Sequence, residues 1–121
     1  MERKKTLVLG ATDNPGRYAY LAANRLVAAG HEIVNIGIKK GEVAGVPIRP
    51  ASDIPTDIHT VTLYIGPQRQ PQYYDYILHA KPRRVIFNPG TENPELKALV
   101  EQQGIEALEA CTLVLLSTGQ Y

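Results

Sequence analysis

The sequence has one cysteine and no long apolar run, and each of these absences excludes a class of protein. A single thiol, Cys111, cannot form a disulfide framework, which favours a reducing environment. No apolar run approaches the ~20 residues that a membrane-spanning helix needs, and we find no charged leader followed by an apolar signal core. We therefore expect a soluble, cytoplasmic protein that makes no membrane contact.

The chain also has almost no excess of charge of either sign. Its 13 Lys and Arg residues stand against 12 Asp and Glu residues, so the net charge is +1. Binding to duplex DNA requires a broad basic field, which this balance does not supply. We expect no nucleic-acid partner, and any recognition of an anion must be local.

Residue spacings typical of a metal site or a catalytic centre are missing as well. One cysteine and three scattered histidines, His31, His59 and His79, form no metal-ligand cluster. We expect His31 and His59 to be surface or packing residues, and His79 to interact with the dipole of its helix. The sequence therefore favours a binding protein over an enzyme.

Apolar runs rich in Val, Ile and Leu alternate with helical patterns along all 121 residues, and no linker divides them. This alternation predicts one α/β domain, residues 1–121, with a three-layer, Rossmann-like fold. We expect a mainly parallel sheet of five or six strands with helices on both faces. The main strands are predicted at 6–10, 32–38, 59–65 and 85–87, shorter apolar segments lie at 46–49, 105–108 and 112–116, and residues 39–45 form a basic loop. Helices are predicted at 17–29, 71–80 and 94–103, and one helical turn at 52–55.

Three residues mark helix ends. Gly30 follows the first predicted helix, as a glycine C-cap does. Asn93 is a good N-cap for the third helix, and Pro94 suits its first position. These signals set the end of the first helix and the start of the third.

The most informative segment follows the first predicted strand, where residues 9–18 read LGATDNPGRY. Gly10 permits a sharp turn, and the start of the following helix offers free N–H groups and a partial positive charge to an anion. Gly10 and Gly16 are separated by five residues, so the segment is neither a dinucleotide fingerprint nor a P-loop. The pattern still predicts a phosphate-binding loop in which Thr12 offers a hydroxyl group and Arg17 lies beside the phosphate.

The second predicted strand is followed by two basic residues, Lys39 and Lys40. An NAD site instead places an acid about 20 residues beyond the glycines, where it binds the ribose hydroxyls. Two ammonium groups suit a phosphate on the adenosine ribose, which coenzyme A (CoA) carries at the 3′ position and NADP at the 2′ position. The alternative is a solvated pair of loop charges.

Three segments together resemble a known family: LGATDNPGRY at 9–18, GHEIV at 30–34 and EVAG at 42–45. They look like the small stand-alone CoA-binding proteins, which are similar to the N-terminal domain of the succinyl-CoA synthetase α subunit. The resemblance extends to FNPG at 87–90 and to the late cysteine, Cys111. It implies a Rossmann-like domain that binds CoA or acyl-CoA.

The resemblance also implies which residues touch the ligand. Gly10, Ala11, Thr12 and Arg17 would hold the pyrophosphate, the loop at 37–43 would meet the adenosine, and residues 65–67 would flank the ligand. The full set of predicted ligand-binding residues is Gly10, Ala11, Thr12, Asn14, Arg17, Tyr18, Gly37, Ile38, Lys39, Lys40, Val43, Ile65, Gly66, Pro67, Asn88 and Gly90.

Two further groups of residues have local interpretations. Tyr73 and Tyr76 share one face of the second helix and are expected to pack on the sheet, whereas Tyr74 is free to stack on a base or to face a partner. The pair Arg83 and Arg84 is expected to form a charged surface turn.

The function expected from the sequence is non-catalytic binding of CoA or acyl-CoA where the parallel strands end. One alternative is an NAD(P)-responsive regulatory module that acts through a partner. Another is an enzyme that handles acyl-CoA thioesters through Cys111, although we expect this residue to be a buried small hydrophobe. A protein partner or a homo-oligomer is compatible with each of these functions.

Overall fold

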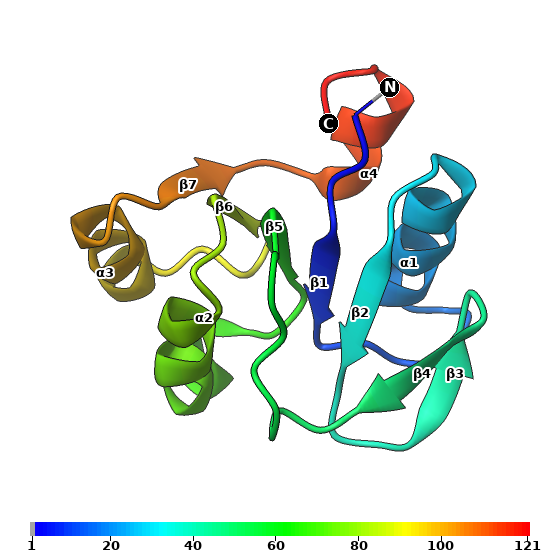
Figure 1. Cartoon of the computed structure of the whole chain (residues 1–121), viewed down its shortest axis with the longest axis horizontal. Coiled ribbons are helices and arrows are strands. Elements are labelled where there is room, and N and C mark those ends of the chain that lie inside the picture. Colours follow the sequence, from blue (N-terminus) through cyan, green and yellow to red (C-terminus); the bar gives the residue numbers. More distant parts are fainter. Residues whose placement is uncertain (1) are drawn as a thin grey trace.

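The computed structural model describes residues 2–121, which form a sheet with helices packed on both faces (Figure 1). The strand order is β3-β4-β2-β1-β5-β6-β7. The strands are β1 (Thr6–Leu9), β2 (Ile33–Ile36), β3 (Gly41–Val43), β4 (Val46–Arg49), β5 (Thr60–Leu63), β6 (Arg84–Phe87) and β7 (Glu106–Glu109). The helices are α1 (Tyr18–Ala28), α2 (Tyr74–Ala80), α3 (Pro94–Gln102) and α4 (Thr112–Ser117), and the short 3-10 turns η1 (Pro67–Arg69) and η2 (Pro71–Tyr73) precede α2.

All neighbouring strands run parallel except β3 and β4. The parallel strands therefore end at one edge of the sheet, called the carboxyl edge below, and begin at the opposite, amino edge. The strands β2 and β4 lie on one side of β1 and β5 lies on the other, so the strand order reverses between β1 and β5. Ligands of open α/β sheets bind outside the carboxyl ends of the strands at such a reversal. The predicted Rossmann-like α/β fold is confirmed.

The described residues form seven strands, not the five or six that the sequence predicts. The unpredicted strand is β3, within the segment expected to be a basic loop. Ala44 and Gly45 have φ values of 54° and 79°, and Val43 pairs with Val46 across them. Positive φ at both central residues is typical of a two-residue hairpin turn. Since alanine rarely adopts this conformation, the sequence gives little sign of the hairpin.

Two apolar cores lie on opposite faces of the sheet, because successive side chains of a strand point to opposite sides. The core on the α2 and α3 side includes Ile77, Phe87 and Leu96. The core on the α1 and α4 side includes Val8 and Leu26. Both faces of the sheet are therefore covered, as its predominantly parallel strands require. No helix within residues 2–121 has the length and apolar character needed to cross a bilayer.

Two predicted elements are wrong. The segment at 112–116, expected to be a strand, is helix α4, and the segment at 52–55 contains no helical turn. A threonine followed by four apolar residues suits a short strand as well as a short helix, so tertiary contacts decide. The deciding contact is made by Asn88, whose Oδ1 accepts a hydrogen bond from the Thr112 N–H at 2.9 Å. This side chain satisfies a donor that the first turn of α4 leaves free.

The Arg83 and Arg84 pair is not the surface turn that the sequence predicts, because Arg84 is buried. Its guanidinium donates hydrogen bonds to Thr60 Oγ1 at 2.8 Å and to the main-chain oxygen of Tyr121 at 2.9 Å. Arg84 is the first residue of β6, and its side chain points to the face that holds α1 and α4. Arg83 points to the other face and is exposed.

His31 is a packing residue, which is one of the two roles that the sequence allows for it. Its ring is buried against Tyr121, with the two ring centroids 5.0 Å apart. Its Nδ1 accepts a hydrogen bond from the Lys4 N–H at 3.0 Å. His31 thus joins the segment before β1 to the C-terminal segment.

Candidate functional site

The loop after β1 is held tightly at the carboxyl edge. The N–H groups of Gly10 and Ala11 both donate to the main-chain oxygen of Ile36 at 2.9 Å. Gly10 has a φ of 100°, and a Cβ atom there would lie 2.7 Å from the main-chain oxygen of Tyr64. Only glycine fits this position without displacing backbone. The main chain of this loop therefore lies close to the ends of both strands that neighbour β1, which are β2 and β5.

The outer part of the same loop is exposed and turns into α1. Asn14 Oδ1 accepts from the Gly16 N–H at 2.9 Å, and Thr12 Oγ1 accepts from the Asn14 N–H at 3.2 Å. The N-cap residue of α1 is Arg17, which makes no side-chain capping bond, and the first turn carries no acid. The positive end of α1 is therefore open to an anion from outside the chain. Tyr18 begins the helix with 71% of its surface exposed.

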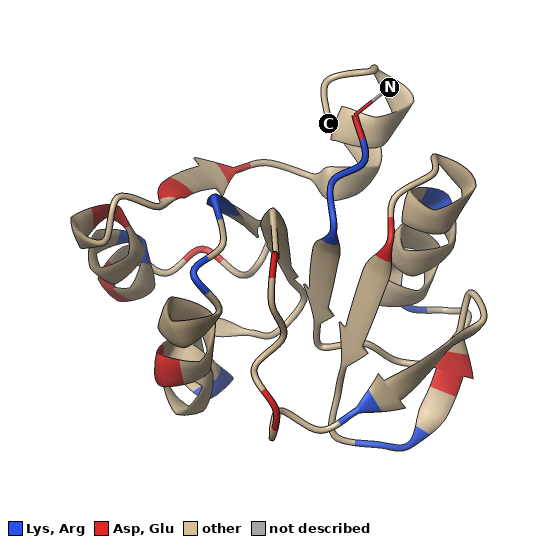
Figure 2. Ribbon diagram, in the orientation of Figure 1, with Lys and Arg blue, Asp and Glu red and all other residues tan. Residues whose placement is uncertain are grey.

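The loop after β2 packs directly against the loop after β1. A Cβ atom on Gly37 would collide with the main-chain oxygen of Ala11, and a Cβ atom on Gly41 would lie 2.8 Å from Asp13 Oδ2. Between these two glycines, Lys39 and Lys40 are exposed, and Ile38 has 78% of its surface exposed. Figure 2 shows basic residues on the segment between β2 and β3 and at the end of β4. The structure thus brings the predicted phosphate loop and the predicted basic loop together.

A cavity of about 380 Å³ lies between the β2 loop and the start of α2. Its lining residues are Gly37, Ile38, Pro50, Ala51, Gln72, Tyr73 and Tyr76. The Tyr76 hydroxyl donates to the main-chain oxygen of Asp53 at 3.1 Å. Burial and then the Asp53 carboxylate raise the pKa of Tyr76, which keeps this donor protonated. The cavity combines aromatic and aliphatic walls next to the two lysines.

Three of the lining residues, Pro50, Ala51 and Gln72, are not among the predicted ligand-binding residues. They come from segments after β4 and before α2 that meet only in the folded chain. Tyr74 is not part of this cavity. Its hydroxyl donates to Glu95 Oε1 at 2.9 Å and accepts from Asn93 Nδ2 at 2.8 Å, so the ring is tied to the start of α3.

Four of the predicted ligand-binding residues have buried side chains: Ala11, Val43, Ile65 and Asn88. Val43 packs in the core beneath the hairpin of β3 and β4. Asn88 Nδ2 donates to Thr62 Oγ1 at 2.7 Å and to the Leu63 main-chain oxygen at 2.8 Å, and its Oδ1 binds the start of α4. The hydrogen bonds of the Asn88 amide therefore all lie within the chain, and this residue positions β5, β6 and α4.

Gln70 is a further organising residue that sequence reasoning missed. Its side chain is fully buried, and Nε2 donates to the main-chain oxygens of Ile65 at 2.9 Å and Thr91 at 2.8 Å. Its Oε1 accepts from Asn93 Nδ2 at 2.9 Å. Gln70 thus connects the loops that follow β5 and β6. In these loops Gly66 is half-buried, and Gly90 is exposed with a φ of 92°.

Cys111 is half-buried at the N-cap of α4, not fully buried as the sequence predicts. The neighbouring Tyr64 hydroxyl is buried and has no hydrogen-bond partner within residues 2–121. Burial raises the pKa of Tyr64 to about 12, so this phenol stays protonated at neutral pH. Among the described residues, no group of three or more His, Cys, Asp or Glu side chains is arranged to hold a metal ion.

The chain is similar to several solved structures. The crystal structure of an uncharacterized protein is 54% identical, with a TM-score of 0.97 and complete coverage of both chains. A hypothetical protein from Pyrococcus horikoshii is 26% identical, with a TM-score of 0.82 over 93% of this chain and 80% of that one. A protein from Thermus thermophilus is 21% identical, with a TM-score of 0.82 over 98% and 91%, a likeness that concerns the fold alone.

No significant match was found among curated proteins. Residues 4–117 nevertheless match the profile of the CoA binding domain. This match extends from the segment before β1 to the end of α4 and includes every loop of the carboxyl edge. The chain belongs to the CoA binding domain family.

Proposed function

We propose that this protein binds CoA or acyl-CoA across the carboxyl edge and carries out no chemistry of its own. The observation that carries the proposal is the uncapped start of α1, whose preceding loop packs against the β2 loop that holds two exposed lysines. CoA has a pyrophosphate, which would bind at the start of α1, and a 3′-phosphate, which would bind to the lysines. Membership in the CoA binding domain family supports the same ligand.

The pyrophosphate would bind at the loop between β1 and α1. Gly10, Ala11 and Thr12 bring main chain close to the ligand, and the free N–H groups of α1 supply hydrogen bonds and a partial positive charge. Asn14 shapes this loop through its bond to the Gly16 N–H. The guanidinium of Arg17 adds a full charge beside the helix end, in a geometry that suits two phosphate oxygens.

The adenosine would lie along the β2 loop. The cavity of about 380 Å³ has the aromatic and aliphatic lining that a purine ring requires, and Tyr73 and Ile38 belong to its wall. Lys39 and Lys40 are close enough in sequence to the cavity residue Ile38 for either ammonium group to bind the 3′-phosphate. The exposed Ile38 side chain would lose contact with water in the complex, which adds to the affinity.

The pantetheine arm would leave the pyrophosphate along the ends of β5 and β6. Residues Gly66, Pro67 and Gly90 border this path, and Asn88 and Ile65 support it from below without touching solvent. Nothing along this path combines an acid, a base and a nucleophile within residues 2–121. Binding without turnover is therefore the function that the chemistry of the site supports.

The proposal is tested by calorimetric titration with CoA, dephospho-CoA, NADP and NAD. We expect CoA to bind about tenfold more tightly than dephospho-CoA, because only CoA carries the 3′-phosphate that accepts charge-assisted hydrogen bonds from the lysines; tenfold corresponds to about 1.4 kcal/mol. NADP binding above CoA binding would favour the regulatory alternative. NAD binding as tightly as CoA would overturn the role of the lysines.

A further inference from the structure

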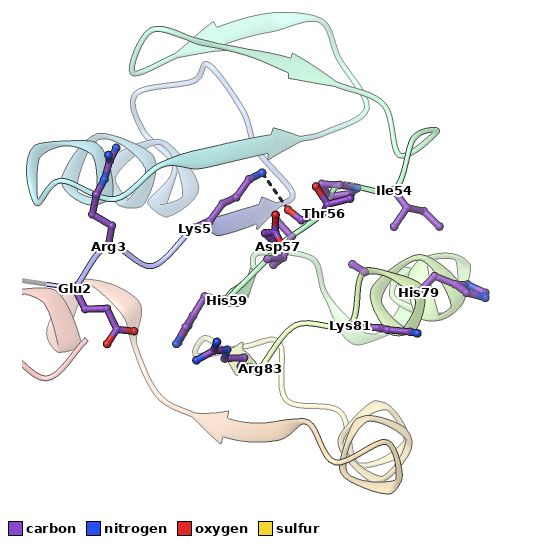
Figure 3. Close-up of a pocket in the computed structure, with 13 residues that line it drawn as sticks. Glu2, Arg3, Lys5, Ile54, Thr56, Asp57, His59, His79, Lys81 and Arg83 are labelled. Atoms are coloured by element: carbon purple, nitrogen blue, oxygen red, sulfur yellow. Dashed lines mark hydrogen bonds between the residues drawn. The ribbon is translucent and has the colours of Figure 1, made fainter.

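A second cavity lies at the amino edge, opposite the candidate CoA site. It has a volume of about 600 Å³ and opens between the segment before β1, the segment before β5 and the end of α2 (Figure 3). Its wall carries four Lys or Arg residues and two histidines against two acids. A volume of this size accommodates a small organic molecule. The charge balance of the wall favours an anion.

The sheet itself aligns three of these basic residues. Thr6, Thr60 and Arg84 are partners across β1, β5 and β6, so the residues before them, Lys5, His59 and Arg83, are neighbours too. The main chain confirms this alignment, since the His59 N–H donates to Lys5 and the Arg83 N–H donates to His59, both at 2.9 Å. Because the Thr60 and Arg84 side chains share the α4 face, the preceding side chains share the opposite face.

The row holds two full positive charges, Lys5 and Arg83, on either side of His59, and each is more favourable with a counter-ion. Lys5 has one, since its Nζ lies 3.8 Å from Glu32 Oε2 and donates to the Thr56 main-chain oxygen at 3.0 Å. Arg83 makes no side-chain hydrogen bond or ion pair with any residue in 2–121. His59 Nδ1 bonds to Thr60 Oγ1 at 2.7 Å, which leaves Nε2 available.

Lys81 adds a further exposed cation on the adjoining wall, and no residue in 2–121 pairs with its side chain either. Its φ is 49°, and that of Asp57, also on the wall, is 59°, so two of the three non-glycine residues with positive φ border this cavity. At Lys81 this conformation is the left-handed end of helix α2, a common way for a helix to stop. Lys81 also offsets the partial negative charge at the end of α2.

We propose that this amino-edge cavity binds a small polyvalent anion, a molecule with two or more phosphate or carboxylate groups, through Arg83, Lys81 and His59. The three residues come from two strand starts and a helix end, so a single small ion would not reach all of them. A ligand with separated negative groups would. Arg83 offers the fork geometry that suits such groups, and Lys81 offers a mobile point charge.

The experiment is a nuclear magnetic resonance titration of backbone amides with inorganic pyrophosphate and, separately, with citrate. We expect saturable shifts at 57–59 and 81–84 with a dissociation constant below about 1 mM for at least one of the two anions. Tighter binding of pyrophosphate identifies a phosphate ligand, and tighter binding of citrate identifies a polycarboxylate. The amides at 10–17 report separately on the proposed CoA site, so either site can fail without the other.

Two variants make the test independent of folding. Lys81→Gly removes the charge and suits the positive φ, so it is expected to fold at least as well as the parent chain. Arg83→Gln removes a charge at an exposed position. Each variant should weaken anion binding at least about fivefold, whereas Arg25→Gln, an exposed change on α1, should leave it unchanged. Absence of saturable shifts up to about 10 mM anion, shifts confined to 10–17, or unchanged binding in both pocket variants would overturn the proposal.

Discussion

The guanidinium of Arg84 lies 4.4 Å from the centre of the Tyr121 ring and donates a hydrogen bond to the Tyr121 main-chain oxygen at 2.9 Å. Lys4 Nζ donates to the same oxygen at 2.6 Å, and the Tyr121 hydroxyl bonds to Thr6 Oγ1. One aromatic residue therefore ties the segment after α4 to β1 and β6. This cluster stabilises the fold on the side away from the carboxyl edge.

Arg84→Gln should lower the free energy of unfolding by about 2–3 kcal/mol, because it removes two buried charge-assisted hydrogen bonds and a cation–π contact. The measurement is urea denaturation followed by circular dichroism. Arg83→Gln is the matched control, since the Arg83 side chain is next in sequence but exposed. This change should alter the free energy of unfolding by less than about 0.5 kcal/mol. Equal effects of the two changes would contradict the structural role of Arg84.

Asn88→Ala should destabilise the chain by about 2–4 kcal/mol, because it leaves the Thr112 N–H and the Leu63 main-chain oxygen without their side-chain partner. Hydrogen exchange should show the greatest loss of protection in α4. Asn24→Ala removes only one exposed bond to Tyr20 and serves as the control, with a loss below about 0.5 kcal/mol. An α4 that stays protected in Asn88→Ala would refute this assignment.

Gly10→Ala should destabilise more than Gly30→Ala, although both glycines have a positive φ. A Cβ atom at Gly30 meets nothing within 4 Å, so that change costs only the backbone strain of about 1–2 kcal/mol. At Gly10 the Cβ atom also approaches the Tyr64 main chain, and the loop must move. We expect CoA affinity to fall at least about tenfold in Gly10→Ala alone, measured by calorimetry.

Lys39→Gln combined with Lys40→Gln should weaken CoA binding about tenfold and leave dephospho-CoA binding unchanged, because only CoA carries the 3′-phosphate. Calorimetry with both ligands on the same preparation gives the comparison. If both ligands lost affinity equally, the lysines would act on the pyrophosphate or on the fold instead.

Stability should fall as the pH decreases below about 6.5, the ordinary pKa of histidine. Burial, followed by the charges of Lys4, Arg84 and Arg3, lowers the pKa of His31 in the folded chain. The unfolded chain therefore takes up protons first, and the linkage relation makes unfolding easier as the pH falls. Protonation at Nδ1 would also remove the bond from the Lys4 N–H.

Burial and the charge of Arg84 also lower the pKa of His59, which adds to the same trend. Urea denaturation between about pH 7.5 and pH 5 measures the slope, which should be smaller in His31→Gln than in the parent chain. Arg25→Gln, an exposed change on α1 that removes no histidine, should keep the parent slope.

Local signals were sufficient for part of this fold. Asn93 caps α3 as predicted, accepting from the Glu95 and Leu96 N–H groups, and Gly30 ends the first helical segment with a φ of 91°. Each of these helix ends depends on residues within one turn of the chain, so the local sequence is enough to predict it. The alternation of strands and helices likewise predicts the parallel sheet.

Features that depend on distant contacts were not predictable. Helix α4 owes its start to Asn88, 24 residues earlier in the chain. The burial of Arg84 requires Tyr121, and the cavity at the carboxyl edge requires segments after β4 and before α2. The ligand-binding loops were predictable because each directly follows a predicted strand. The cavity wall was not predictable because its residues come from several separate segments.

The outermost strands of the sheet are β3 and β7. Both are short, and both carry exposed carboxylates: Glu42 on β3, and Glu106 and Glu109 on β7. If two copies of β7 paired in antiparallel register, Glu106 of one copy would face Glu109 of the other. Repulsion between such facing charges discourages the edge-to-edge growth that leads to aggregation. The glutamates on the edge strands thus disfavour pairing between the sheets of two copies. Helices and loops remain as the surfaces for any association.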